Sequence, residues 1–136
     1  MSDDARTVVQ RWNDAFMGGD LDELATLIHD DFVDHSPYPG QGSDKAAFLE
    51  KARTSKEATP DIVYRLVDQV VEGDRVADRF EVTATPVGDL MGLPANGSKI
   101  TFTLVDFLRI EDGKVIENWF LADAAALMAQ LGDGAG

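Results

Sequence analysis

Residues 99–121 read KITFTLVDFLRIEDGKVIENWFL, and this stretch decides the fold. Residues 98–110 and 115–121 both place apolar side chains at every second position, as strands with one buried face do. Asp112-Gly113 lies between them and is typical of a tight hairpin turn. The stretch therefore predicts two neighbouring antiparallel strands.

One aspartate falls on the apolar face of the first of these strands. At period two, Asp106 shares that face with Ile100, Phe102, Leu104, Leu108 and Ile110. A carboxylate with such neighbours loses its hydration, so its pKa rises unless a donor or a cation compensates. Asp106 is therefore a candidate for proton chemistry near neutral pH or, alternatively, an acceptor in a structural hydrogen-bond network.

The same patterns extend to the rest of the chain. Residues 62–71 and 75–87 form a second hairpin around Glu72-Gly73-Asp74, which gives a sheet of about four long antiparallel strands. Three helices precede the sheet. The first stops at Gly18-Gly19, the second runs from Asp20 to His29, and the third is capped by Ser43 or Asp44 and runs to about Thr54. A short helix after Asp123 buries Leu127, Met128 and Leu131. The fold class is α+β.

Length and composition limit the possible functions. The 136 residues predict one domain over residues 1–131 and a flexible tail over 132–136. The sequence contains no cysteine, so thiol nucleophiles, disulfides and thiolate metal sites are excluded. A net charge of −13 argues against nucleic acid and anionic membranes as partners. The acidic N-terminus and the lack of a long apolar run predict a cytoplasmic protein.

Metal and nucleotide sites are not expected. Two histidines without cysteine leave carboxylate sites alone for a metal, and the glycine-rich segments lack the phosphate-loop lysine pattern. His29 is interpreted as a structural residue at the end of the second helix, where an imidazolium suits the helix dipole. We therefore predict neither a metal nor a cofactor.

Three stretches carry a family resemblance that covers nearly the whole chain. They are WNDAFMGGDLDELATLIHDDFVDHSPYPGQG (residues 12–42), TPVGDLMGLPANG (85–97) and DFLRIEDGKVIENWFLADAAALMAQLG (106–132). Together they resemble the SnoaL-like polyketide cyclases of the nuclear transport factor 2-like superfamily. The resemblance implies a cone-shaped half-barrel, in which a curved sheet and three N-terminal helices enclose a deep apolar pocket. It also implies a homodimer through the outer sheet face.

The resemblance also implies roles for individual positions. In the cyclases an aspartate on the last strand performs the acid–base step of an aldol ring closure, and Phe120 stands at that place here. Limonene epoxide hydrolase, a relative, has one of its acids at the same place. Many relatives carry a histidine where this chain has Asn118. The position of Asp106 is histidine in the cyclase and resembles the protonated aspartate of ketosteroid isomerase.

The isomerase's other two positions align at the N-terminal end. Its oxyanion-binding tyrosine aligns with Trp12, and its base aligns at or next to Ser36, beside Asp34 and His35. Each known active site is therefore reproduced only in part.

These residues give a site hypothesis. Asp106 is the acid or the enolate-stabilising donor, His35 the proton shuttle, and Asn118 the group that orients the carbonyl. The pocket is expected to open between His35 and residues 88–97, with Phe120 on its wall. The substrate-binding candidates are Trp12, Asp34, Tyr38, Arg79, Phe102, Leu104, Trp119 and Phe120.

Three functions remain open on the sequence. The first is a cofactor-independent lyase or isomerase that enolises a hydrophobic, polyketide-like carbonyl compound and cyclises or isomerises it. The second is a non-catalytic module that binds an apolar small molecule, which Phe120 at the acid position favours. The third is an epoxide hydrolase or hydroxylase-like relative, which would need a water held by Asp106 and a second acid.

Overall fold

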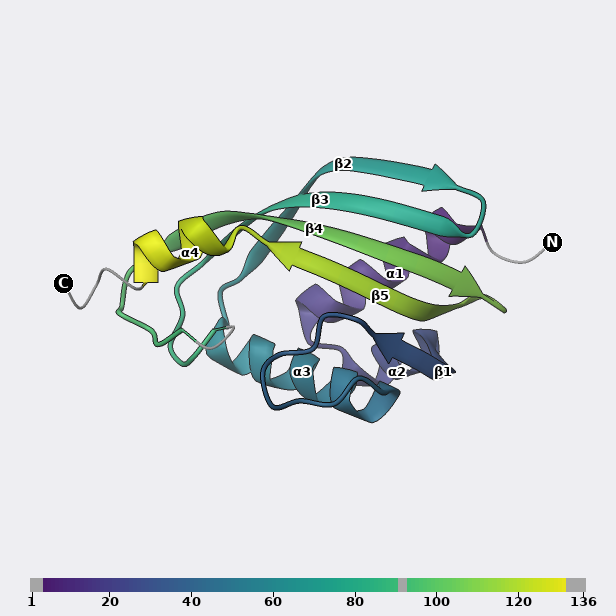
Figure 1. The fold of residues 1–136 in the computed structure, drawn as a ribbon, viewed down its shortest axis with the longest axis horizontal. Helices are drawn as coiled ribbons and strands as arrows, with labels where there is room; N and C mark the ends of the chain where they lie inside the picture. The colour runs from purple at the N-terminus through teal and green to yellow at the C-terminus, as the bar shows by residue number, and fades with distance from the viewer. Residues whose placement is uncertain (1–3, 91–92, 132–136) are drawn as a thin grey trace.

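A computed structural model of the chain describes residues 4–90 and 93–131. One curved sheet of five strands covers three helices, and a fourth helix lies at one end of the sheet (Figure 1). The elements in chain order are α1 (Ala5–Gly18), α2 (Leu21–Leu27), β1 (Ile28–Asp34), α3 (Lys45–Ala58), β2 (Val63–Glu72), β3 (Arg75–Ala84), β4 (Ile100–Glu111), β5 (Lys114–Ala122) and α4 (Ala124–Leu131).

The sheet has the strand order β1-β5-β4-β3-β2. Strands β2 to β5 form the predicted antiparallel meander, with both hairpins at the predicted turns. Strand β1 was not predicted: it pairs in parallel with β5, so the sheet is mixed. The α+β class and the four long antiparallel strands are confirmed, and β1 adds a fifth, shorter strand to the edge of the sheet.

Helices α2 and α3 begin at the residues that the sequence indicates, Asp20 and Asp44, and α1 begins in the same way after Asp4. The side chains of Asp4, Asp20 and Asp44 each accept a hydrogen bond from a backbone N–H in the first turn of α1, α2 and α3. Helix α1 ends at Gly19, which has a φ of 70° that favours glycine. Helix α3 continues to Ala58, about one turn beyond its predicted end.

Two side chains near these helices differ from expectation. His29 lies on β1 and not at the end of a helix, so the helix-dipole role assigned to it is wrong. Met128 of α4 is 58% exposed, whereas Leu127 and Leu131 are buried as predicted.

The buried core lies between the helices and the concave face of the sheet. One cluster joins α1, α2 and α3 to the end of the sheet near Val76 and Leu108, and a second joins α4 to Val82 and Phe102. The outer face of the sheet carries Arg79, Phe107 and Leu121, which are exposed. Within the described part of the chain, no helix is long and apolar enough to cross a membrane.

Candidate active site

A cavity opens between the two core clusters, under the concave face of the sheet. The space within it that the centre of a water molecule can occupy is about 70 Å³, and part of the cavity is open to solvent. Helices α1 and α3 form one wall and strands β2 to β5 the other. The lining residues are Trp12, Asn13, Phe16, Met17, Tyr38, Phe48, Lys51, Ser55, Thr59, Ile62, Tyr64, Phe80, Leu90, Phe102, Leu104, Asp106, Asn118 and Phe120.

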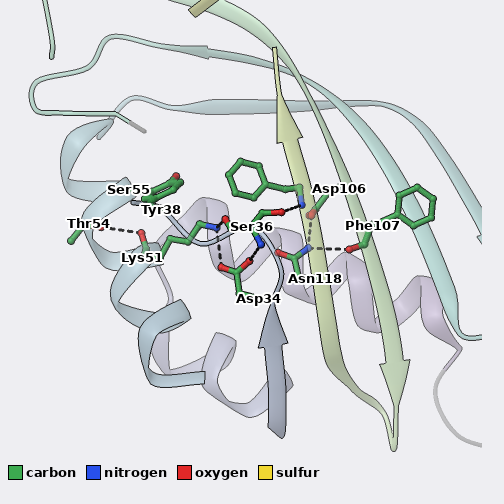
Figure 2. Close-up of polar contacts among 10 residues, drawn as sticks. Asp34, Ser36, Tyr38, Lys51, Thr54, Ser55, Asp106, Phe107 and Asn118 are labelled. Atoms are coloured by element: carbon green, nitrogen blue, oxygen red, sulfur yellow. Dashed lines mark hydrogen bonds and ion pairs between the residues drawn. The ribbon is translucent and has the colours of Figure 1, made fainter. Parts of the chain in front are cut away.

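Asp106 lies in this cavity on the inner face of β4, as the alternation predicts, and its residue is 9% exposed. Asn118 of the adjacent strand donates a short hydrogen bond from Nδ2 to Asp106 Oδ1 (Figure 2). The same amide donates to the Phe107 carbonyl oxygen over 3.1 Å. Both protons of the Asn118 amide are therefore used within the protein, and neither is left to orient a substrate carbonyl.

Burial raises the pKa of the Asp106 carboxyl to about 7, and the nearby carboxylate of Asp78 raises it as well. The Asn118 hydrogen bond and the Lys51 charge oppose this shift only in part. At neutral pH the Asp106 carboxyl therefore exists in both its protonated and its ionised form, as a general acid–base group requires.

A second buried carboxylate lies directly across from Asp106. Asp78 on β3 is its partner in the β3–β4 register and is 2% exposed. Its two oxygens accept hydrogen bonds from Asn13 Nδ2 (3.0 Å) and Gln69 Nε2 (2.9 Å). Because both oxygens have donors, Asp78 is held as a structural acceptor beside the cavity. Asp78 was not predicted as a site residue, although it alternates with the buried Val76 and Phe80 in the same way as Asp106 alternates with its apolar neighbours.

The cavity also contains a buried cation that the sequence analysis missed. Lys51 of α3 is 3% exposed, and its Nζ lies 3.0 Å from Asp34 Oδ2 and 2.9 Å from the Ser36 carbonyl oxygen (Figure 2). Burial lowers the pKa of Lys51, while the Asp34 carboxylate raises it. The signal was present in the sequence: Lys51 follows Phe48 by three residues and precedes Ser55 by four, on the buried face of α3.

Aromatic rings surround the ammonium group of Lys51. Nζ lies 4.1 Å from the centroid of Phe120 and 4.7 Å from that of Tyr38. The Phe120 backbone N–H donates to Ser36 Oγ, which ties β5 to the segment after β1. Tyr38 Oη lies 3.0 Å from Ser55 Oγ. Phe120 and Tyr38 therefore line the cavity as predicted.

Four other predicted site residues also lie at or next to the cavity. Trp12, Phe102 and Leu104 line it directly. Asp34 lies behind its wall, where Lys51 and the Ser36 N–H bind its oxygens.

Three predicted site residues lie elsewhere. His35 is exposed on the outer side of β5, where its Nε2 is 2.9 Å from Glu117 and its ring stacks on Trp119 with centroids 4.4 Å apart. Arg79 is 50% exposed and pairs with Asp68 on the outer face. The assignments of His35 as proton shuttle and of Trp119 and Arg79 as pocket residues are therefore wrong. The chain turns outward after Asp34, which the sequence alone does not show.

One group of side chains has the spacing of a cation site. His29, Glu111 and Asp112 bring a nitrogen and two carboxylates within 4.8 Å of one another, away from the cavity. His29 Nδ1 accepts a hydrogen bond from the Asp31 backbone N–H, so in the neutral ring the proton is on Nε2, which faces the carboxylates. Nε2 lies 3.6 Å from Glu111 Oε2 and 3.7 Å from Asp112 Oδ2, so the ring faces both acids at more than hydrogen-bond distance.

Comparison with known proteins agrees with this geometry. The family model of the SnoaL-like polyketide cyclases matches residues 6–131. Aklanonic acid methyl ester cyclase DnrD of Streptomyces peucetius is 25% identical over 93% of this chain and 89% of its own length.

Two solved structures are similar over nearly the whole chain. IdmH of Streptomyces antibioticus, for which a polyketide cyclase function is suggested, is 30% identical over 94% of this chain and 98% of its own, with a TM-score of 0.79. AclR of Streptomyces galilaeus, for which a hydroxylase function is suggested, is 29% identical over 95% and 96%, with a TM-score of 0.79. The chain belongs to the SnoaL-like polyketide cyclase family.

Proposed function

We propose that this protein is a cofactor-independent enzyme that enolises a hydrophobic, polyketide-like carbonyl compound, for ring closure or isomerisation. The observation that carries the proposal is Asp106, a buried carboxyl with a pKa of about 7 in a largely apolar cavity. Family membership supports a small-molecule substrate of this kind.

In the proposed reaction the ionised Asp106 takes a proton from the carbon next to the substrate carbonyl. The C–H bond breaks, its electron pair forms a carbon–carbon double bond, and the carbonyl electrons move onto oxygen as an enolate. The enolate carbon then attacks a second carbonyl of the same molecule or is reprotonated at another position. Asp106 returns the proton in either case.

Asn118 is a positioning residue in this scheme. Its amide fixes Asp106 Oδ1 between two strands and favours the ionised form, which keeps the pKa from rising further. Because His35 lies on the outer face, the proposal assigns both proton transfers to Asp106, the carboxyl group of the described cavity lining.

Deuterium exchange tests the proposal without the natural substrate. The purified protein is incubated in D₂O with apolar ketones such as 1-tetralone, and loss of the α-proton signal is followed by NMR. Binding is measured by Trp12 fluorescence in a Trp119→Phe background, which leaves one tryptophan, in the cavity. We expect faster exchange than in buffer, and a loss of 10²–10⁴-fold in Asp106→Asn with binding retained.

Ketones that bind in the cavity but exchange no faster than in buffer would contradict the enzyme and favour the non-catalytic binding module. Equal exchange by the parent and by Asp106→Asn would show that Asp106 is not the base. An exposed variant such as Asp68→Asn serves as the control, because its side chain lies on the outer face.

We also propose that two copies pair through the outer face of the sheet. The support is its exposed apolar area: Val70 is 65%, Phe107 49% and Leu121 71% exposed. Light scattering on the eluting protein should give the mass of a dimer, and Phe107→Glu should give that of a monomer. A monomeric parent protein would contradict this proposal.

A further inference from the structure

The proposed reaction needs a hydrogen-bond donor for the oxygen that becomes negative, and Asn118 is not free to serve. Both of its amide protons are bound to Asp106 and to the Phe107 carbonyl. Asn13 donates one amide proton to Asp78, and the Tyr38 hydroxyl pairs with Ser55. A cationic donor stabilises a developing negative charge more strongly than a neutral amide or hydroxyl does, so a charged residue of the lining is the strongest candidate for this role.

Lys51 is the basic side chain of the described lining, and its ammonium group has a proton to spare. Nζ carries three protons, of which Asp34 Oδ2 and the Ser36 carbonyl oxygen accept two. Among the described residues no third acceptor bonds to Nζ; the aromatic faces of Phe120 and Tyr38 lie there instead. An oxygen that enters beside these rings can accept the remaining proton.

We propose that Lys51 is the oxyanion-binding catalytic residue of this cavity and selects apolar aromatic ligands that carry an enolate, or its stable mimic a phenolate. The inference rests on the proposed function and identifies the hydrogen-bond donor that the enolate oxygen needs. The Asp34–Lys51 ion pair holds Nζ in place before the substrate arrives, so no reorganisation is needed during the reaction.

The charge movement in the reaction fits this role. When Asp106 takes the proton, one negative charge leaves its carboxylate and develops on the substrate oxygen. If that oxygen is bonded to Lys51, the charge moves next to a cation inside a largely apolar cavity. Burial also lowers the pKa of Lys51, which brings its acidity closer to that of an enol.

The test uses 2-naphthol and more acidic naphthols as enolate mimics, with 2-methoxynaphthalene as the neutral ligand of similar shape. Affinity is read from Trp12 fluorescence in the Trp119→Phe background, and the ionisation of the bound naphthol from its absorption spectrum. We expect the parent protein to bind the naphtholate form at pH 7, with affinity increasing with the acidity of the naphthol.

A variant without the cation should lose this preference. Lys51→Met alone leaves Asp34 buried without its partner, so the double variant Lys51→Met/Asp34→Asn is used as well. We expect the double variant to bind naphtholates at least tenfold more weakly and 2-methoxynaphthalene within twofold of the parent. Lys45→Met, which removes a positive charge from the same helix outside the cavity lining, should leave both affinities unchanged.

Several outcomes would overturn the inference. The first is that the parent protein binds the naphthol in its neutral form, and the second is that the double variant keeps the preference for naphtholates. The third is that Tyr64→Phe, which removes another hydroxyl of the cavity lining, loses this preference while the double variant does not. Trapping of a ketone on Lys51 by borohydride would make it a covalent nucleophile and would also overturn it. Because naphthol binding involves no turnover, failure of the exchange experiment leaves this measurement interpretable on its own.

Discussion

Asp106→Asn gives the sharpest test of the buried carboxyl, because the structure predicts how protein stability depends on pH. The pKa of Asp106 in the folded protein is about 7, against 3.8 for an exposed aspartate. Between these values the carboxyl is protonated in the folded protein and ionised in the unfolded chain. The folded state therefore binds the extra proton, and its stability falls as pH rises from about 4 to about 7.

The magnitude follows from the shift of about three pKa units. At about 1.4 kcal/mol per unit, ionisation of Asp106 lowers the free energy of unfolding by about 4 kcal/mol between pH 4 and pH 8. Asparagine stays neutral and can still accept the hydrogen bond from Asn118. Asp106→Asn should therefore resemble the parent protein near pH 4 and exceed its stability by about 3–4 kcal/mol near pH 8.

The assay is urea unfolding at several pH values, followed by the fluorescence of the buried Trp12. The other acidic groups titrate in both proteins, so the difference between the two stability curves isolates Asp106. Asp68→Asn, an exposed variant, should give a difference of less than about 1 kcal/mol at every pH. If the difference in stability between Asp106→Asn and the parent protein is equally small at every pH, the raised pKa and the acid–base role are refuted.

Three further outcomes are expected. His35→Ala should change the rate of α-proton exchange by less than about twofold, since the ring lies on the outer face. A loss of about a hundredfold would show that His35 takes part in the reaction. Phe120→Asp should lower the free energy of unfolding by roughly 2 kcal/mol in urea titrations, with Lys51 limiting the loss; unchanged stability would place Phe120 outside an enclosed pocket. Gly19→Ala should destabilise by about 1 kcal/mol because of its φ of 70° and its contact with Lys56, whereas Gly18→Ala should not; equal thermal midpoints would contradict this.

The sequence predicted what depends on local periodicity. Strands β2 to β5, their turns and the burial of Asp106 follow from a period of two that runs unbroken from Ile100 to Ile110. The starts of α2 and α3 follow from Asp20 and Asp44, each of which accepts a hydrogen bond from a backbone N–H in the first turn of its helix. These features need no knowledge of distant parts of the chain.

The errors involve contacts between distant segments. Strand β1 is short, carries charged residues, has an irregular register and is ordered by pairing with β5, so no local pattern marks it. The outward turn at His35 is fixed by its backbone N–H, which donates to the Asn118 carbonyl. From the sequence alone, Lys51 is expected to be a solvated surface lysine. Its burial depends on the ion pair with Asp34, which lies 17 residues earlier in the chain.

The place of the acid within the sheet explains how this cavity differs from the family pattern. Asp78, Asp106 and Phe120 lie opposite one another across β3, β4 and β5. The family resemblance places histidine at position 106 and the acid at position 120, so here the acid stands one strand further into the sheet. Side chains directly opposite on neighbouring strands are about 5 Å apart. A carboxylate at position 120 would therefore repel Asp106. An apolar Phe120 instead lets Asp106 titrate near neutral pH, while the Phe120 ring packs against the Lys51 ammonium group.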